Sequence, residues 1–176
     1  GLADHGSDVI ICDLESESKG LANTHKQIEK TGKKCWSYFL DVTKKSQIQN
    51  MVSDILNDIG SIDILVNNAG ILTPTSLEDI DEETWDSHFE VNTKGVLLMC
   101  QSVLPHMRKK KFGRIINIAS IAGRQGSPTQ GHYASTKSAV ITLTRVLAQE
   151  VGEAGITVNA ICPGIILTEM GKNNLG

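Results

Sequence analysis

A tyrosine and a lysine four positions apart are the residues whose types and spacing most directly suggest chemistry. Tyr133 and Lys137 lie in the stretch GHYASTKSAV, which has helical character, so one helical turn separates a phenol from an ammonium group. A free tyrosine has a pKa of about 10. A positive charge about 4 Å away, at an effective dielectric near 20, contributes roughly 4 kcal/mol, enough to bring that pKa toward neutrality. The spacing permits an acid–base catalyst, although an ordinary packed helix pair has the same spacing.

The elements that must position this pair follow from the hydrophobic pattern. Short runs rich in Ile and Val predict buried strands at 8–12, 35–40, 62–66, 114–119 and 156–161. Segments of helical period separate them at 15–31, 44–59, 82–109 and 131–151, with Asp81 as the expected N-cap of the third. This alternation predicts one α/β domain over residues 1–176, a doubly wound parallel sheet with helices on both faces.

Polar and turn-forming residues follow every predicted strand, at the edge where such sheets bind ligands. They are Asp13, Asp41-Val42, Asn67-Asn68-Ala69-Gly70, Ser120 and Pro163-Gly164. Any one of them alone is weak evidence, because loops are generally polar. Five such sites at one edge indicate a binding site.

Together these motifs resemble the short-chain dehydrogenase/reductase family. The resemblance rests on the strand-end residues above, on Asn92 and on Tyr133-x-x-x-Lys137, with Ser120 preceding Tyr133 by 13 residues. It implies a Rossmann-like three-layer α/β/α fold that binds NAD(P). It also implies homotetramers joined through the helices at 82–109 and 131–151.

The resemblance assigns catalytic roles to four residues. Tyr133 would exchange a proton with the substrate oxygen, and Ser120 would hydrogen-bond and orient that oxygen. Lys137 would activate Tyr133 and hold the nicotinamide ribose. Asn92 would position a water that links Lys137 to solvent, although the residues alone are equally consistent with a buried amide or a helix bend.

The resemblance also implies the cofactor contacts. Asp41 and Val42 would flank the adenine, Asn68, Ala69 and Gly70 would approach the adenosine ribose, and Pro163, Gly164 and Thr168 would border the nicotinamide. Asp13 ends the second strand of the expected fold, where a carboxylate binds the ribose 2′-hydroxyl and repels a 2′-phosphate, so NAD is favoured without excluding NADP. For Asp41, capping of the next helix is an alternative role.

The expected reaction is hydride transfer between NAD(H) and a secondary alcohol or carbonyl group. The expected substrate is a small-molecule alcohol or ketone. Two alternatives stay open. One is an NADPH-dependent 3-oxoacyl thioester reductase of the same family. The other, from a different class, is a non-catalytic nucleotide-binding protein, because fold alone does not prove activity.

A glycine-rich phosphate loop is expected about 20 residues before the acidic ribose-binding residue. If Asp13 is that residue, the loop lies before residue 1, and TEMGKNNLG stands where the family places a substrate-covering segment. We therefore expect a fragment, incomplete at both ends. Its sheet should have a gap between the strands at 8–12 and 62–66, and the isolated chain should fold poorly and bind cofactor weakly.

Composition excludes several other classes. A net charge of −3 disfavours nucleic-acid binding, and the basic run at 108–111 is explained by the end of a helix. No apolar run is long enough to span a membrane. The five histidines lack metal-ligand spacing, so no metal is expected. Four separated cysteines without a C-x-x-C pair predict reduced core thiols and a cytoplasmic protein.

Overall fold

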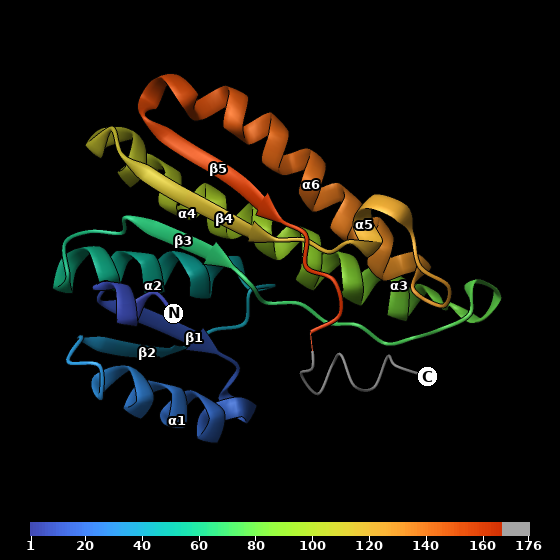
Figure 1. The fold of residues 1–176 in the computed structure, drawn as a ribbon, viewed down its shortest axis with the longest axis horizontal. Helices are drawn as coiled ribbons and strands as arrows, with labels where there is room; N and C mark the ends of the chain where they lie inside the picture. Colours follow the sequence, from blue (N-terminus) through green and yellow to red (C-terminus); the bar gives the residue numbers. More distant parts are fainter. Residues whose placement is uncertain (167–176) are drawn as a thin grey trace.

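The fold was analysed in a computed structural model, which describes residues 1–166 (Figure 1). Its strands are β1 (Val9–Asp13), β2 (Cys35–Phe39), β3 (Ile64–Asn67), β4 (Gly113–Ile118) and β5 (Ile156–Ile161). Its α-helices are α1 (Ser18–Glu29), α2 (Lys45–Asp58), α3 (Glu82–Phe89), α4 (Gly95–Lys110), α5 (Ala122–Gln125) and α6 (Gly131–Val151). A π-helical segment, η4 (Glu90–Lys94), joins α3 to α4. Short 3-10 turns are η1 (Ala3–His5), η2 (Glu15–Glu17), η3 (Leu77–Asp79) and η5 (Gly152–Ala154).

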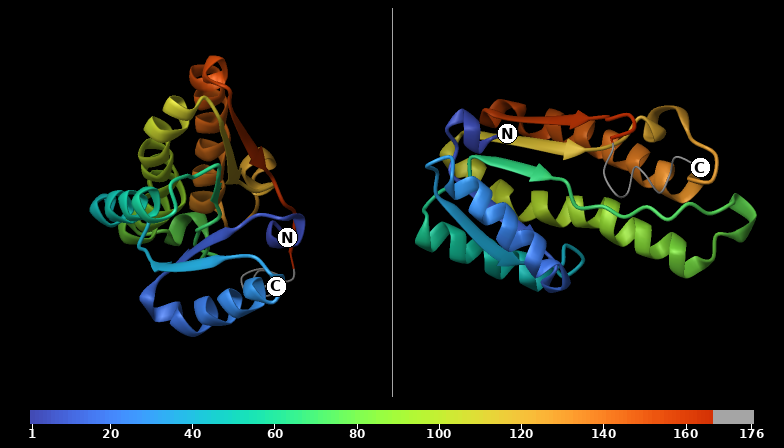
Figure 2. Two further views of the ribbon diagram at one scale, coloured as in Figure 1. Left: turned by 90° about the vertical axis from the view of Figure 1, so that its left-hand side faces the viewer. Right: turned by 60° about the horizontal axis from the view of Figure 1, so that its bottom comes forward.

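All strand pairs are parallel, which confirms the predicted α/β class. β1 pairs with β2, and β3, β4 and β5 form a second sheet in that order. α4 packs on β3 and β4, α6 packs on β4 and β5, and α1 packs on β1 and β2. Figures 1 and 2 show that α1 lies well apart from α4 and α6.

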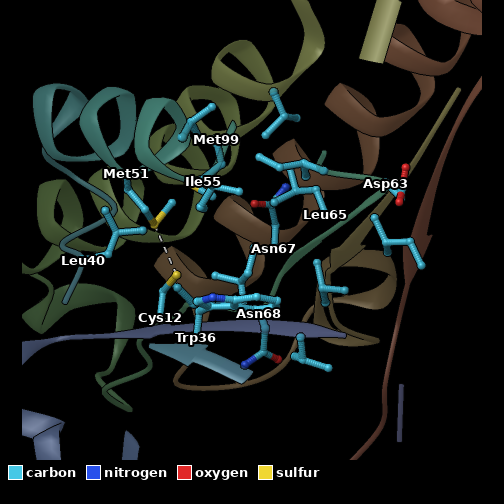
Figure 3. Close-up of a pocket in the computed structure, with 18 of the residues that line it drawn as sticks. Cys12, Trp36, Leu40, Met51, Ile55, Asp63, Leu65, Asn67, Asn68 and Met99 are labelled. Carbon is cyan, nitrogen blue, oxygen red and sulfur yellow. Dashed lines mark hydrogen bonds between the residues drawn. The ribbon is translucent and has the colours of Figure 1, made fainter. Parts of the chain in front are cut away.

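The expected interruption of the sheet is confirmed. β1 and β3 are neighbours in the fold but belong to separate sheets. A cavity of about 790 Å³ lies between them. Figure 3 shows Cys12 and Trp36 on the β1–β2 side, facing Leu65, Ile55 and Met99 across the cavity. The backbone edges that face this cavity are therefore available for pairing.

The strands are buried more on one face than their continuous apolar sequences predict. In β4, Gly113, Ile115 and Asn117 are buried, whereas the alternate residues are half-buried. In β3, Ile64 and Val66 are exposed and line the cavity. One face of the β3–β4–β5 sheet packs on α4 and α6. The Ile64 and Val66 side chains of β3 face the cavity.

Helix boundaries agree with the sequence except along 82–109 and at the two ends of 15–31. Residues 82–109 were expected to be one helix, but η4 inserts a π turn within it. Asp81 caps α3 as predicted, because its side chain accepts a 2.7 Å hydrogen bond from the Thr84 N–H. The helix at 131–151 has the predicted bounds. The predicted helix at 15–31 begins as the 3-10 turn η2 and ends at Glu29.

Two further sequence expectations concern membrane-spanning helices and the cysteines. Within residues 1–166 no helix is both long and apolar enough to cross a bilayer. The four cysteines are all unpaired, as expected, but only Cys100 is buried, and Cys12 is exposed. The prediction of core thiols is therefore wrong for Cys12, because its strand borders the cavity between the sheets.

Candidate active site

The carboxyl ends of β4 and β5 bring the candidate residues to one edge. The Ala119 N–H donates to the Ile161 carbonyl at 2.8 Å, and the Ile121 N–H donates to the Pro163 carbonyl at 2.9 Å. Ser120 thus lies between two backbone hydrogen bonds, one to the last residue of β5 and one to the segment that follows it. Figure 1 shows these strand ends directed toward α5 and the first half of α6. The edge that carries Ser120 therefore meets the helix that carries Tyr133.

Tyr133 and Lys137 lie together on α6, as predicted. The Lys137 Nζ is 5.6 Å from the centroid of the Tyr133 ring. It donates a 2.8 Å hydrogen bond to the Ile118 carbonyl, at the end of β4. The Ser120 Oγ accepts a 3.1 Å hydrogen bond from the Ala122 N–H and also interacts with Tyr133. The structure therefore brings together the three side chains expected to carry the chemistry.

The protonation of Tyr133 differs from the sequence expectation. Burial raises the pKa of Tyr133, and hydrogen bonding with Ser120 lowers it by a smaller amount. The expected lowering by Lys137 is therefore wrong for this structure. The reason is geometric, since the ammonium is bonded to the Ile118 carbonyl and the phenol is desolvated. In this state Tyr133 is a neutral phenol, suited to donate a proton.

The pKa of Lys137 is shifted more strongly than that of Tyr133. The Lys137 residue is 4% exposed, and burial lowers its pKa from 10.5 to about 8. Burial penalises the charged form of a lysine, which explains the direction. An amine with this pKa can release or accept a proton in mildly alkaline solution, which is useful in a proton relay.

Asn92 is fully buried in the π segment η4. Its Oδ1 accepts from the Ile71 N–H at 2.8 Å, and its Nδ2 donates to the Ile71 carbonyl at 3.0 Å and to the Thr136 Oγ1 at 3.1 Å. Of the open interpretations from the sequence, the buried and hydrogen-bonded amide is therefore confirmed, and the helix contains a π turn at this point. The side chain ties the segment after β3 to α6, and water positioning stays a prediction.

Two glycines allow close approach in the site. A Cβ on Gly70 would lie 3.2 Å from the Asn92 Oδ1 and 3.4 Å from the Lys137 Nζ. A Cβ on Gly123 would lie 2.7 Å from the Lys137 carbonyl carbon and 2.8 Å from the Ser138 N. Gly70 was predicted as a site residue. Gly123 was missed, because nothing in the local sequence shows that α5 packs closely against α6.

Replacing Gly123 with alanine should destabilise the protein by about 1–3 kcal/mol, because backbone atoms of α6 cannot move aside as a flexible side chain could. Chemical denaturation measures this change. Gly20 in α1 is the matched control, since nothing lies within 4 Å of its added Cβ. Gly20→Ala should raise stability by about 0.5–1 kcal/mol. Equal effects of the two substitutions would contradict the close packing of α5 on α6.

The predicted cofactor residues lie at one end of the cavity. Asp13, Val42, Asn68 and Ala69 line it. Asp13 is the last residue of β1, is exposed, and accepts a 2.9 Å hydrogen bond from the Leu14 N–H through Oδ1. Within the described residues its second oxygen has no partner, which leaves it able to bind a ribose hydroxyl.

The remaining predicted cofactor residues are placed differently. Asp41 does not cap α2, whose N-cap is Lys44, because its Oδ1 accepts from the Thr43 N–H and hydroxyl at 2.9 and 2.7 Å. The capping alternative is therefore wrong. Pro163 lies beside the Ser120 loop, Gly164 is exposed, and Thr168 lies outside the described residues.

Several residues that support the site were missed from the sequence. Thr136 is fully buried, and its hydroxyl donates to the Tyr133 carbonyl at 2.7 Å and accepts from Asn92. His88 and His132 are buried against each other next to Tyr133. Thr136 could have been found from the sequence, because it lies within the Tyr-x-x-x-Lys motif. The histidine contact could not, because it joins residues 44 positions apart.

Comparisons with known proteins agree with this geometry. The family profile described as short chain dehydrogenase matches residues 1–175. The 3-oxoacyl-[acyl-carrier-protein] reductase FabG of Staphylococcus epidermidis is 37% identical over 169 residues, covering 96% of this chain and 69% of that protein. The enzyme of the same name from Thermotoga maritima is 40% identical, covering 96% of this chain and 68% of that protein.

A solved structure also matches closely. The crystal structure of NAD+-bound xylitol dehydrogenase superposes with a TM-score of 0.93 at 30% sequence identity. The match covers 98% of this chain and 66% of that chain, so this chain spans just under two thirds of the xylitol dehydrogenase.

Proposed function

The chain belongs to the short-chain dehydrogenase family of NAD(P)-dependent oxidoreductases, and from this premise we propose that it interconverts a secondary alcohol and a carbonyl with NAD(H). The proposal is supported chiefly by one observation. Ser120, at the end of β4, lies with Tyr133 and Lys137 of α6 at one edge of the sheet. An acid–base group, a hydrogen-bonding group for the substrate oxygen and a titratable amine therefore lie together.

Each residue has a defined part in this reaction. The Ser120 hydroxyl orients the substrate oxygen, and the Tyr133 hydroxyl gives a proton to it in reduction or takes one in oxidation. Lys137 returns the proton between Tyr133 and solvent, consistent with its pKa of about 8. The nicotinamide supplies the hydride chemistry when the cofactor is bound. Asn92 and Gly70 hold the segment after β3 close to Lys137.

NAD is the proposed cofactor, with Asp13, Asn68, Ala69 and Gly70 on its adenosine side. The exposed Asp13 carboxylate favours a ribose 2′-hydroxyl over a 2′-phosphate. The similar xylitol dehydrogenase was solved with NAD+ bound, which supports the same choice.

Asp13→Asn should change cofactor preference. Asparagine keeps an acceptor oxygen but loses the charge, so a hydrogen bond worth about 1.5–3 kcal/mol becomes a neutral one worth about 0.5–1.5 kcal/mol, and the repulsion of a phosphate disappears. Together these changes should lower kcat/KM for NAD+ roughly 10- to 100-fold relative to NADP+. Steady-state kinetics with both cofactors measure this ratio. Glu15→Gln, an exposed carboxylate two residues farther on, is the control and should leave it unchanged. An unchanged ratio for Asp13→Asn would remove Asp13 from the cofactor site.

A second candidate function, reduction of a 3-oxoacyl thioester with NADPH, is favoured by the reductases that are 37% and 40% identical. The two are separated by assaying the full-length protein with a polyol and NAD+, and with a 3-oxoacyl thioester and NADPH. Faster turnover of the polyol supports the first proposal, and faster turnover of the thioester supports the second.

Assembly and location are further proposals. The exposed apolar side chains of Trp85, Leu97 and Val146 lie on the α3–α4 stretch and α6, which fits a homotetramer joined through these helices. A light-scattering mass of the full-length protein tests it, and a monomer would contradict it. The four unpaired cysteines are consistent with a cytoplasmic location.

A further inference from the structure

His88 and His132 form a buried pair beside the candidate active site. Their side chains come from α3 and from the first turn of α6, and the residues are 2% and 0% exposed. Their rings meet edge to face, with centroids 4.1 Å apart and an interplanar angle of 85°. His132 immediately precedes Tyr133, and within residues 1–166 neither of its ring nitrogens has a hydrogen-bond partner. The chemistry proposed above uses neither ring.

The contacts of His88 define its protonation. Its Nδ1 lies 2.7 Å from the Thr84 carbonyl oxygen, so Nδ1 must carry a hydrogen and donate. Its Nε2 accepts a 3.3 Å hydrogen bond from the Thr73 N–H, so Nε2 must be unprotonated. Only a neutral imidazole satisfies both contacts. A proton on Nε2 would face the Thr73 N–H and break that hydrogen bond.

Thr73 belongs to the segment between β3 and α3, which continues directly from Asn68-Ala69-Gly70. This segment is held at alternate residues. Asn92 holds Ile71 by two hydrogen bonds, His88 holds the Thr73 N–H, and the Thr129 carbonyl accepts from the Thr75 N–H at 2.8 Å. His88 and Asn92 are one helical turn apart, so one stretch of helix holds two points of the segment.

We propose that His88 is a positioning residue: as a neutral imidazole it holds the segment after β3 in register with α6, and His132 is the packing partner that disfavours its protonated form. This inference rests on the proposed function, because the segment positions Gly70 against Lys137 and the adjoining residues against the cofactor. Acidification should release Thr73 and weaken cofactor binding before the fold is lost.

The electrostatic environment of His88 also favours its neutral form. Burial lowers the pKa of His88, the hydrogen bond to Thr84 raises it by less, and the charge of His132 lowers it further. The folded pKa is below the ordinary value of 6.5, so the neutral form is favoured by folding. The contact is therefore complete above that ordinary value and is lost as pH falls through the lowered one.

Other ionisable groups lie on the elements packed around His88. They are His132, Tyr133 and Lys137 on α6, Glu78 and Asp79 on η3, and Asp81, Glu82, Glu83, Asp86 and Glu90 on or beside its own helix. Among the ionisable groups of the described residues, His132 is the one whose electrostatic interaction lowers the pKa of His88. The pair can therefore be tested by changing His132.

The first measurement is NMR on the full-length wild-type protein. At pH 7 the ring of His88 should be the neutral tautomer with hydrogen on Nδ1, and Thr73 should show hydrogen-exchange protection. After correction for intrinsic exchange, this protection should fall as pH decreases below 6. An imidazolium, or the tautomer with hydrogen on Nε2, at pH 7 would overturn the proposal.

Two variants separate the hydrogen bond from packing. His88→Phe keeps a ring but removes the acceptor, so Thr73 protection at pH 7 should fall roughly 3- to 10-fold. His88→Gln places an oxygen near the position of Nε2 and cannot titrate, so protection should stay within about twofold and become independent of pH between 5 and 7. Unchanged Thr73 protection in His88→Phe would overturn the proposal.

Kinetics and His132→Phe complete the test. In His88→Phe the KM for NAD+ should rise several-fold with kcat within about twofold, and His88→Gln should restore KM. His132→Phe removes the interaction with His132 that lowers the pKa of His88, so protection of Thr73 should be lost at a higher pH than in wild type. An unchanged pH midpoint for the loss of Thr73 protection would overturn the part assigned to His132.

The test also separates this inference from the proposed function. Because Thr73 exchange needs no turnover, a protein without dehydrogenase activity would refute the proposed function and leave this readout intact.

Discussion

Tyr133→Phe is expected to lower kcat by about 10³-fold while the Kd for NADH stays within about twofold. The substitution removes only the hydroxyl oxygen, which is the proton donor and acceptor of the proposed reaction, and general acid–base groups contribute about 10²- to 10⁴-fold. The ring keeps its contact with Lys137, so the site should remain assembled. Stopped-flow or steady-state turnover, with NADH binding followed by fluorescence, measures both quantities on the full-length protein.

The chain offers a matched control, because its other tyrosine lies elsewhere. Tyr38 is a half-buried residue of β2, so Tyr38→Phe removes the same atom at a distance from the candidate site. It should leave kcat within about twofold. Turnover that survives Tyr133→Phe would end the catalytic assignment and favour the non-catalytic nucleotide-binding alternative.

Lys137→Met is expected to abolish most turnover and yet to stabilise the fold at pH 7. The folded pKa of Lys137 is about 8, against an ordinary 10.5, so the unfolded chain binds more protons between those values and wild-type stability rises with pH across that range. The shift corresponds to about 3 kcal/mol. Losing the hydrogen bond to the Ile118 carbonyl offsets about 1 kcal/mol, which leaves a net gain of about 2 kcal/mol.

The sign of the stability change caused by Lys137→Met can be tested by denaturation at two pH values. The stability advantage of Lys137→Met should be about 2 kcal/mol near pH 7 and should fall by about 3 kcal/mol by pH 10.5, so that the variant is then about 1 kcal/mol less stable than wild type. At that pH wild-type Lys137 is neutral in the folded state and half-neutral in the unfolded one. Lys94→Met is the control, because Lys94 is exposed and paired with Glu90, and its effect should stay within about 0.5 kcal/mol. A pH-independent difference for Lys137→Met would show that the amine is not desolvated in the folded protein.

Local patterns were sufficient for most of the fold. The strand at 156–161 and the helix at 131–151 have the predicted bounds. Asp81 was identifiable as a cap, because capping depends on a side chain and an amide three residues later. Strand alternation with helices also predicted the parallel sheet, whereas its gap was predicted from the strand order that the family resemblance implies. By contrast, local periodicity predicts regular helix at η4, because the π turn there involves contacts of Asn92 with residues on other elements.

For the site, the sequence by itself determined which groups exist and at which edge they gather, since parallel strands end together and residues four apart share a helix face. The tertiary structure alone decided their protonation and their support. The pKa of Tyr133 is raised, and Lys137 donates a hydrogen bond to the Ile118 carbonyl. Gly123 allows α6 to approach closely, and His88 accepts a hydrogen bond from the Thr73 N–H. Desolvation and hydrogen bonding depend on which distant segments meet, and that information is not contained in local spacing.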